Sequence, residues 1–175
     1  LGDRPVIAED LGYLTDSVRK LVADCGFPGM KVLEFAFDAR DASSAEYLPH
    51  RYPVNCIVYT GTHDNETMAG WYESIRPEER EAVQRYLHRA PGAVEPLYWD
   101  LACTAMASVA QWCVIPLQDW LGLDNRARIN HPSTLGGNWR WRAAPGVLTP
   151  ALARQIRRVT ETYERCPAAA PRSSF

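Results

Sequence analysis

The fold is decided by residues 56–65, which read Cys56-Ile57-Val58-Tyr59-Thr60-Gly61-Thr62-His63-Asp64-Asn65. Four apolar residues, a suitable length for a buried strand, are followed at once by a Thr-Gly-Thr turn and three polar side chains. Two earlier segments have the same order, because the apolar run 5–8 ends at Glu9 and the run 31–37 ends at Asp38. We therefore expect acids and a histidine to gather at the carboxyl ends of three strands.

Helical patterns separate these strands. A helix is expected to begin after Thr15 and to stop at residues 26–29, and another is expected to begin at Pro77, where acids follow in the first turn. The remaining segments predict, in order, a largely buried helix over 97–112, a fourth strand over 113–117 that Pro116 weakens, and a last helix capped by Thr149 with Pro150 in its first turn.

This alternation predicts an α/β fold in which crossover helices join parallel strands. Both a (β/α)8 barrel and a doubly wound sheet fit the alternation. Polar residues at the carboxyl ends of strands favour the barrel, where enzymes build their active sites, although open α/β sheets also bind ligands at that edge. About four βα units cannot close eight strands, so we expect the C-terminal half of a TIM barrel over residues 1–166. Residues 167–175, which are rich in Ala, Pro, Arg and Ser, predict a disordered tail.

The composition argues against several classes of protein. The chain has 175 residues and a formal net charge of −2, and its basic residues are scattered among the acids, so a nucleic-acid surface is not expected. A membrane span is not expected either, because no run of about 18 apolar residues occurs. Five cysteines, an odd number without a C-x-x-C pair, favour a reducing, cytoplasmic location. The first residue is Leu1 rather than Met, which suggests a piece of a longer chain.

Glu9 is the first candidate for chemistry. A carboxyl group at a strand end, half enclosed by apolar walls, can become a proton donor at neutral pH, and cleavage of a glycosidic bond needs such an acid. The alternative is an acid that only caps the following turn. Asp10 suits that second function better than Glu9, because its short side chain readily reaches nearby backbone amides.

The triplet His63-Asp64-Asn65 is the second candidate. Its donors and acceptors could bind neighbouring sugar hydroxyls, and a carboxylate there would stabilise a developing oxocarbenium-like charge. A metal site is the first alternative, but the nearest further ligand is Glu66 and no spaced histidine follows, so no metal is expected. The other alternative is a polar turn with a satisfied histidine.

Aromatic residues supply a third indication, since six Trp and eight Tyr are many for this length and flat rings pack well on sugar faces. Core packing is nevertheless the ordinary function of a large aromatic side chain. Trp99 and Trp112, inside an apolar segment, are assigned to the core. Four others are open between core and sugar contact: Trp71, Tyr72, Trp139 and Trp141.

Two strings, residues 8–12 and 59–65, resemble the active-site motifs of the 4-α-glucanotransferases of glycoside hydrolase family 77. The likeness runs in order from about residue 4 to about residue 165. Further strings that resemble the family are Phe27-Pro28-Gly29-Met30-Lys31-Val32-Leu33, Phe35-Ala36-Phe37-Asp38, Leu48-Pro49-His50, Pro116-Leu117-Gln118-Asp119, Ala127-Arg128-Ile129-Asn130 and Gly137-Asn138-Trp139-Arg140-Trp141-Arg142.

The resemblance implies a retaining, double-displacement transfer of α-1,4-glucan segments between maltooligosaccharides, on a (β/α)8 barrel and without a cofactor. By position, Glu9 matches the general acid/base and Asp64 the aspartate that favours the transition-state shape of the reacting glucose. His63 matches a hydroxyl-binding partner, with Asn65 beside it, and Phe35 matches an aromatic that lies along the glucan near the scissile bond.

The family's nucleophile, an aspartate in an Arg-x-Asp-His-like motif, does not occur in this sequence. A retaining enzyme needs that carboxylate on the opposite face of the sugar. The isolated chain is therefore expected to be inactive without the N-terminal part of its own barrel. Two alternatives remain open: a hydrolase of the α-amylase clan and a non-catalytic glucan-binding fragment.

Overall fold

The computed structural model describes residues 6–12, 14–90 and 97–166, so the expected tail at 167–175 lies outside the described residues. The chain divides into two compact units, Leu1–Arg142 and Ala143–Phe175. The first unit holds the sheet and the second holds helix α6 (Pro150–Thr162), and each is described by itself. The placement of all residues up to 166 in one domain stays a prediction.

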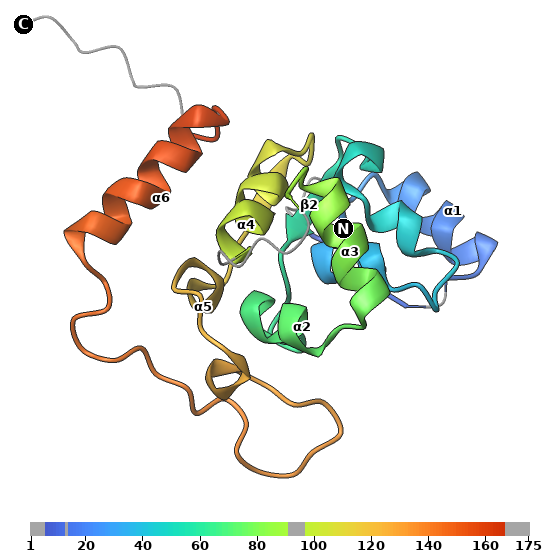
Figure 1. Ribbon diagram of the computed structural model, residues 1–175. Helices are drawn as coiled ribbons and strands as arrows, with labels where there is room; N and C mark the ends of the chain where they lie inside the picture. Colours follow the sequence, from blue (N-terminus) through green and yellow to red (C-terminus); the bar gives the residue numbers. More distant parts are fainter. Residues whose placement is uncertain (1–5, 13, 91–96, 167–175) are drawn as a thin grey trace, which may run out of the picture. The chain divides into compact units, whose positions relative to one another are not determined.

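A parallel sheet of three strands forms the centre of the first unit (Figure 1). Its strands are β1 (Gly29–Val32), β2 (Cys56–Tyr59) and β3 (Trp112–Val114), in the spatial order β1-β2-β3. Tyr59 pairs with Val32 on one side and with Val114 on the other, so the three strands end together. The predicted α/β class with parallel strands is confirmed.

Residues 6–8 are not a strand, contrary to the prediction for 5–8, of which Pro5 lies outside the described residues. The Ala8 amide donates to the Pro28 carbonyl oxygen at 3.0 Å, and two residues further on the Met30 amide donates to Oδ1 of Asp10 at 2.6 Å. The segment thus runs parallel to β1. A regular ladder does not form, because a side-chain carboxylate binds the strand amide.

The second predicted strand, 31–37, is also wrong beyond its first two residues. β1 ends at Val32 and the 3-10 helix η1 (Leu33–Phe37) follows. Leu33, Ala36 and Phe37 are buried, at the i, i+3, i+4 spacing of one helix face. The sequence hides this spacing because nearly every position in the segment is apolar.

Predicted helix starts agree well with the structure. Helix α1 (Asp16–Cys25) begins at Thr15, whose hydroxyl accepts from the Val18 amide, and it ends at Gly26 in the left-handed conformation. Helix α6 (Pro150–Thr162) is capped in the same way by Thr149, and α3 (Pro77–Tyr86) begins at its proline. The other helical segments are η2 (Ser44–Tyr47), η3 (Pro49–Arg51), α2 (Met68–Ser74), α4 (Tyr98–Ala107), α5 (Leu117–Trp120) and η4 (Asn125–Ala127).

The expected helix 97–112 is shorter, because α4 ends at Ala107 and the Ser108 hydroxyl bonds back to the Ala105 carbonyl. Trp112 therefore lies in β3, where it is 60% exposed, and its assignment to a helix core is wrong. The fourth predicted strand, 113–117, is displaced to Trp112–Val114, because Pro116 starts α5 instead of extending the strand. Trp99 packs edge-on against Trp120, with ring centroids 4.7 Å apart.

The core lies on one face of β2, where Cys56 and Val58 meet the helices. Most of its other buried members come from η1, α2, α3 and α4: Leu33, Ala36, Phe37, Met68, Trp71, Val83, Leu101 and Ala105. Tyr52, Leu97 and Ala110 complete it. No disulfide joins any of the five cysteines, all of which lie in the described ranges. Within the described ranges, no helix has the length and apolar character needed to cross a membrane.

A glycine in α2 provides a test of this packing. A Cβ added at Gly70 would lie 2.3 Å from Cγ of Asn125, whose amide bonds the Thr67 amide and Glu66. Helix propensity alone predicts that Gly70→Ala raises the free energy of unfolding by about 0.5–1 kcal/mol. We expect a loss of about 1–3 kcal/mol instead, because the crowded Asn125 must move.

Denaturant unfolding of both single variants and of the double variant would measure this effect. In an Asn125→Ala background the obstructing amide is gone, so Gly70→Ala should become neutral or stabilising. Equal effects of Gly70→Ala in the two backgrounds would contradict the assigned contact.

Candidate functional site

The loop between β2 and α2 carries three of the five predicted site residues, His63, Asp64 and Asn65. Oδ1 of Asn65 accepts hydrogen bonds from the Thr62 amide at 2.9 Å and from the Thr62 hydroxyl at 2.7 Å. The amide oxygen of Asn65 therefore shapes the turn that presents its two neighbours. This arrangement fits the polar-turn alternative for Asn65 at least as well as contact with a ligand.

Both ends of this loop are held by one buried carboxylate, that of Asp119 at the start of the connection after β3. Oδ2 of Asp119 accepts from the Thr60 hydroxyl at 2.5 Å, and Oδ1 accepts from the Met68 amide at 2.8 Å. Burial raises the pKa of Asp119, while the bonds from Met68 and Thr60 oppose that rise. The loop is thereby fixed where it leaves the sheet and where it enters α2.

The side chain of Asp64 is held from two directions and remains half exposed. Nδ2 of Asn130 donates to its Oδ1 at 2.5 Å, and Nε2 of His63 lies 3.4 Å from the same oxygen. Arg128 donates to the main-chain oxygen of Asp64 at 2.7 Å and, through Nε, to that of Asn130 at 3.0 Å. Arg128 thus joins the loop after β2 to the segment after η4.

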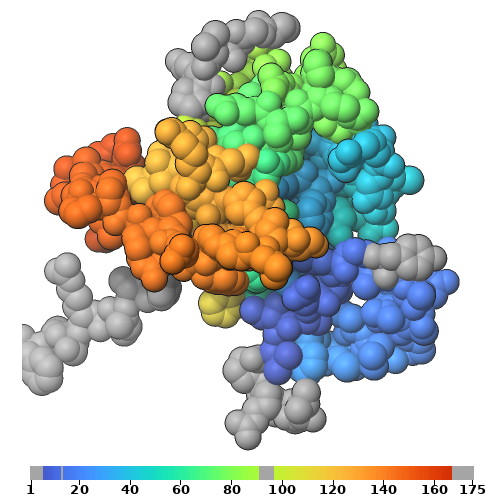
Figure 2. Space-filling model, turned by 90° about the horizontal axis from the view of Figure 1, so that it is seen from below, coloured from blue at the N-terminus to red at the C-terminus, as the bar shows by residue number. Residues whose placement is uncertain are grey.

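The segment after η4 also covers His63. The ring of Trp139 lies 5.1 Å from the imidazole ring, centroid to centroid, at an angle of 36°. The Trp139 amide donates to the Ile129 carbonyl oxygen at 2.7 Å, and Oδ1 of Asn138 accepts from the His131 amide at 2.9 Å. Trp139 therefore belongs to the site rather than to the core, and Figure 2 shows its segment, in orange, at the surface of the face seen from below.

Phe35 lies on η1 and is partly buried. Its ring packs edge-on against Tyr47 with centroids 5.3 Å apart, and Nζ of Lys31 lies 5.1 Å from the centroid of the same tyrosine ring. The side chain is supported but not enclosed, so part of its surface can meet a ligand.

Glu9 is exposed beside β1, whereas its neighbour Asp10 is turned inward onto the Met30 amide. A Cβ added at Gly29 would lie 2.4 Å from Oδ2 of Asp10, so glycine is required there. Asp10, which the sequence favoured for capping the following turn, instead accepts from the Met30 amide, 20 residues away on β1. Among the described residues, no hydrogen bond or ion pair connects Glu9 or Phe35 to the cluster of His63 and Asp64.

Glu34 lies on η1 directly before Phe35, and the sequence patterns did not single it out as a site residue. Its side chain is buried, with the residue 6% exposed, and Oε1 has no hydrogen-bond partner within the described part of the chain. Burial raises the pKa of Glu34 well above its ordinary value, and Asp119 and Glu66 add to the rise, while Arg128 and a hydrogen bond with Asn65 oppose it. An acid in the middle of the apolar run 32–37 is the signal that could have revealed it.

Glu66, the further ligand considered for a metal, is engaged elsewhere. Its Oε1 accepts from Nδ2 of Asn125 at 2.6 Å and its Oε2 accepts from the Ser74 hydroxyl at 2.9 Å. Within the described residues, no group of three or more His, Cys, Asp and Glu side chains is arranged to hold a metal ion.

A family model described as 4-alpha-glucanotransferase matches residues 1–149. The chain belongs to the 4-alpha-glucanotransferase family. It is 46% identical over 167 residues to the 4-alpha-glucanotransferase of Clostridium butyricum, a match that covers 95% of this chain and 34% of that protein. The corresponding enzyme of Thermus thermophilus is 44% identical, with coverage of 94% and 33%. The chain therefore spans about a third of the length of these relatives.

A solved member of the family has a similar structure. The amylomaltase from Streptococcus agalactiae, solved in complex with acarbose, superposes with a TM-score of 0.88 at 38% sequence identity. The match covers 95% of this chain and 33% of that one. The similarity in sequence thus extends to the arrangement of the elements.

The buried carboxyl group of Glu34 predicts a pH-dependent stability. Because its pKa is raised in the folded state, the folded protein binds the proton more tightly, so stability falls as pH rises above the ordinary value of 4.5 toward the raised pKa. Glu34→Gln removes the charge that must otherwise be buried. We therefore expect the Tm of Glu34→Gln, relative to wild type, to increase between about pH 4.5 and pH 8.

Thermal unfolding across this range would test the expectation. Glu81→Gln is the matched control, since the Glu81 side chain is exposed on α3. A Tm difference between Glu34→Gln and wild type that is the same at every pH would show that the titration of Glu34 does not cause the pH dependence of stability.

Proposed function

We propose that this chain is the C-terminal part of a 4-α-glucanotransferase, which transfers α-1,4-glucan segments between maltooligosaccharides. The observation that carries the proposal is the His63–Asp64 pair directly after β2, which Asn130 holds in place. The chain that contains it matches the family over residues 1–149. α-1,4-Glucans and maltooligosaccharides are its substrates, and its chemistry needs no cofactor.

In this proposal, Asp64 binds hydroxyls of the reacting glucose and stabilises the positive charge that develops at its ring. Nδ2 of Asn130 and His63 orient the carboxylate, so that little reorganisation is needed when the charge forms. His63 binds a neighbouring hydroxyl, and the ring of Trp139 limits its rotation.

Glu9 acts as the general acid that protonates the departing glycosidic oxygen and then as the base that activates the acceptor hydroxyl. Among the described residues Glu9 is exposed rather than half enclosed by apolar walls, so it is open to a substrate, while Asp10 holds the segment against β1. Phe35 offers a partly buried aromatic surface for the glucan next to the scissile bond.

The nucleophile comes from a part of the protein outside this chain, which spans only about a third of the length of the relatives. We place the chain in the C-terminal half of a (β/α)8 barrel. An apolar hollow of about 480 Å³ supports this, because Ile57, Trp112 and Val114 line it on the sheet face opposite the core and further strands could cover it. Five cysteines without a disulfide favour a cytoplasmic location.

The complete gene product, incubated with maltotriose, would test the proposed activity. We expect glucose and longer maltooligosaccharides, and a fall in rate of about 10²–10⁴-fold for Glu9→Gln, since general acid catalysis is lost. Asp10→Asn is the neighbouring control and should act mainly on stability. Hydrolysis products alone would favour an α-amylase-clan hydrolase, and binding without turnover would favour a glucan-binding protein.

The orientation of Asp64 gives a second test. Asn130→Ala removes a hydrogen bond to a charged group, which is worth about 1.5–3 kcal/mol, so kcat should fall about 10- to 100-fold. Arg126→Ala is the matched control, because this arginine is close in sequence but, within the described ranges, its side chain pairs only with Asp124. A kcat for Asn130→Ala equal to that of the control would contradict the proposal that Asn130 positions Asp64.

A further inference from the structure

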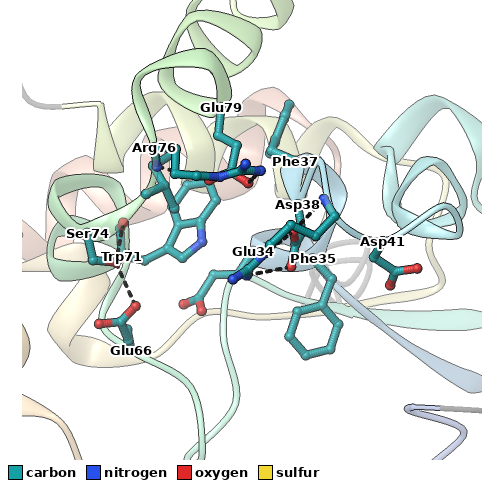
Figure 3. Close-up of a pocket in the computed structure, with 12 residues that line it drawn as sticks. Glu34, Phe35, Phe37, Asp38, Asp41, Glu66, Trp71, Ser74, Arg76 and Glu79 are labelled. Carbon is teal, nitrogen blue, oxygen red and sulfur yellow. Dashed lines mark hydrogen bonds and ion pairs between the residues drawn. The ribbon is translucent and has the colours of Figure 1, made fainter.

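Glu34 contacts the loop after β2 with both its main chain and its side chain. Its amide donates to the Thr60 carbonyl oxygen at 3.3 Å, and the residue is only 6% exposed. In Figure 3 its side chain extends toward Glu66, whereas the ring of the next residue, Phe35, points away from it. Helix η1 thus carries, at adjacent positions, an acid buried against the loop and an aromatic ring that faces elsewhere.

The carboxyl group of Glu34 lies against the turn at Gly61. A Cβ added at Gly61 would lie 2.6 Å from Oε1 of Glu34 and 3.2 Å from Cβ of Asn65. The carboxyl group is also hydrogen-bonded to the Asn65 side chain. Because Oδ1 of Asn65 accepts from the amide and the hydroxyl of Thr62, its Nδ2 is the group that donates to Glu34. The amide group of Asn65 therefore joins the turn to the buried acid.

The same turn sets the main chain of Asp64. The Asp64 amide donates to the Thr62 hydroxyl oxygen at 3.2 Å, and that hydroxyl donates to Oδ1 of Asn65 at 2.7 Å. A continuous series of hydrogen bonds therefore runs from Glu34 through Asn65 and Thr62 to Asp64. Bonds in such a series support one another, so the loss of one is expected to loosen the groups on either side.

We propose that Glu34 is a positioning residue for Asp64, and that it acts through the amide group of Asn65. Asp119 holds the two ends of the loop, and Glu34 holds its middle. The function is one of orientation, because Oε1 of Glu34 is buried and does not meet a ligand. The inference rests on the proposed function, since it concerns how precisely the transition-state carboxylate is placed.

Two substitutions separate the hydrogen bond from the space that Glu34 fills. Glu34→Met has a similar volume but no acceptor oxygen, whereas Glu34→Gln keeps an acceptor for Asn65. Burial, with Asp119 and Glu66 nearby, raises the pKa of Glu34, so the uncharged form is favoured and Gln is a close match to it. Val83→Ala is the control for lost stability, because this buried residue belongs to the core on α3. All variants are made in the complete gene product.

Steady-state transfer from maltotriose should give a kcat for Glu34→Met about 2- to 10-fold below wild type, the loss expected for one neutral hydrogen bond. KM should stay within about twofold of wild type, since the lost interaction acts in the transition state. Glu34→Gln and Val83→Ala should retain the wild-type kcat. In an Asn65→Ala background, where the bond is already absent, Glu34→Met should cause no further loss.

Three results would overturn the proposal. The first is an unchanged kcat for Glu34→Met, and the second is a loss in Glu34→Gln as large as that in Glu34→Met. The third is an equal effect of Glu34→Met with and without Asn65→Ala.

Amide hydrogen exchange provides a measurement that does not depend on turnover. The amides of Thr62 and Asp64 should exchange faster in Glu34→Met than in wild type, and at the wild-type rate in Glu34→Gln. If the wild-type gene product does not redistribute maltotriose, the proposed function is wrong, and exchange still tests the contact of Glu34 with the turn. If it does so while exchange in Glu34→Met is unchanged, only the positioning function is wrong.

Discussion

One buried carboxylate organises the described part of the first unit. Asp119 binds the hydroxyl of Thr60, at the end of β2, and the amide of Met68, at the start of α2. Such an acid is costly to bury unless its oxygens are bonded, and these two donors fill that need. These two donors flank the loop that carries His63 and Asp64. The hydrogen bonds that Asp119 needs therefore also fix the position of this loop.

The candidate site is therefore assembled from the connections that follow two adjacent strands. The loop after β2 supplies His63 and Asp64, and the chain beyond β3 supplies Asp119, Arg128, Asn130 and Trp139. Parallel strands that end together bring these connections to one edge of the sheet, which is where α/β proteins bind their ligands. Removing either connection would leave Asp64 without its support.

Glu34 lies between this cluster and a pocket of about 300 Å³, which Glu34 and Phe35 both line (Figure 3). Its carboxyl group is influenced by Asp119 and Glu66 on the inside and lines the pocket on the outside. Gly61 makes this possible, since a Cβ there would lie 2.6 Å from Oε1 of Glu34. The turn that presents His63 and the acid that borders the pocket are thus packed against each other, and a change in one is expected to affect the other.

The sequence by itself determined the family, the α/β class, strand β2 and the starts of α1, α3 and α6, because capping residues, prolines and a short apolar run act locally. Glu9, Phe35, His63, Asp64 and Asn65 were identified from motifs, and their functions remain proposals. Only the tertiary structure placed Asn130 and Trp139 on Asp64 and His63, 66 and 76 residues away, ended β1 at Val32 and exposed Trp112. These features depend on which distant groups bond to each buried polar atom and which elements cover each apolar face. The local sequence pattern does not contain that information.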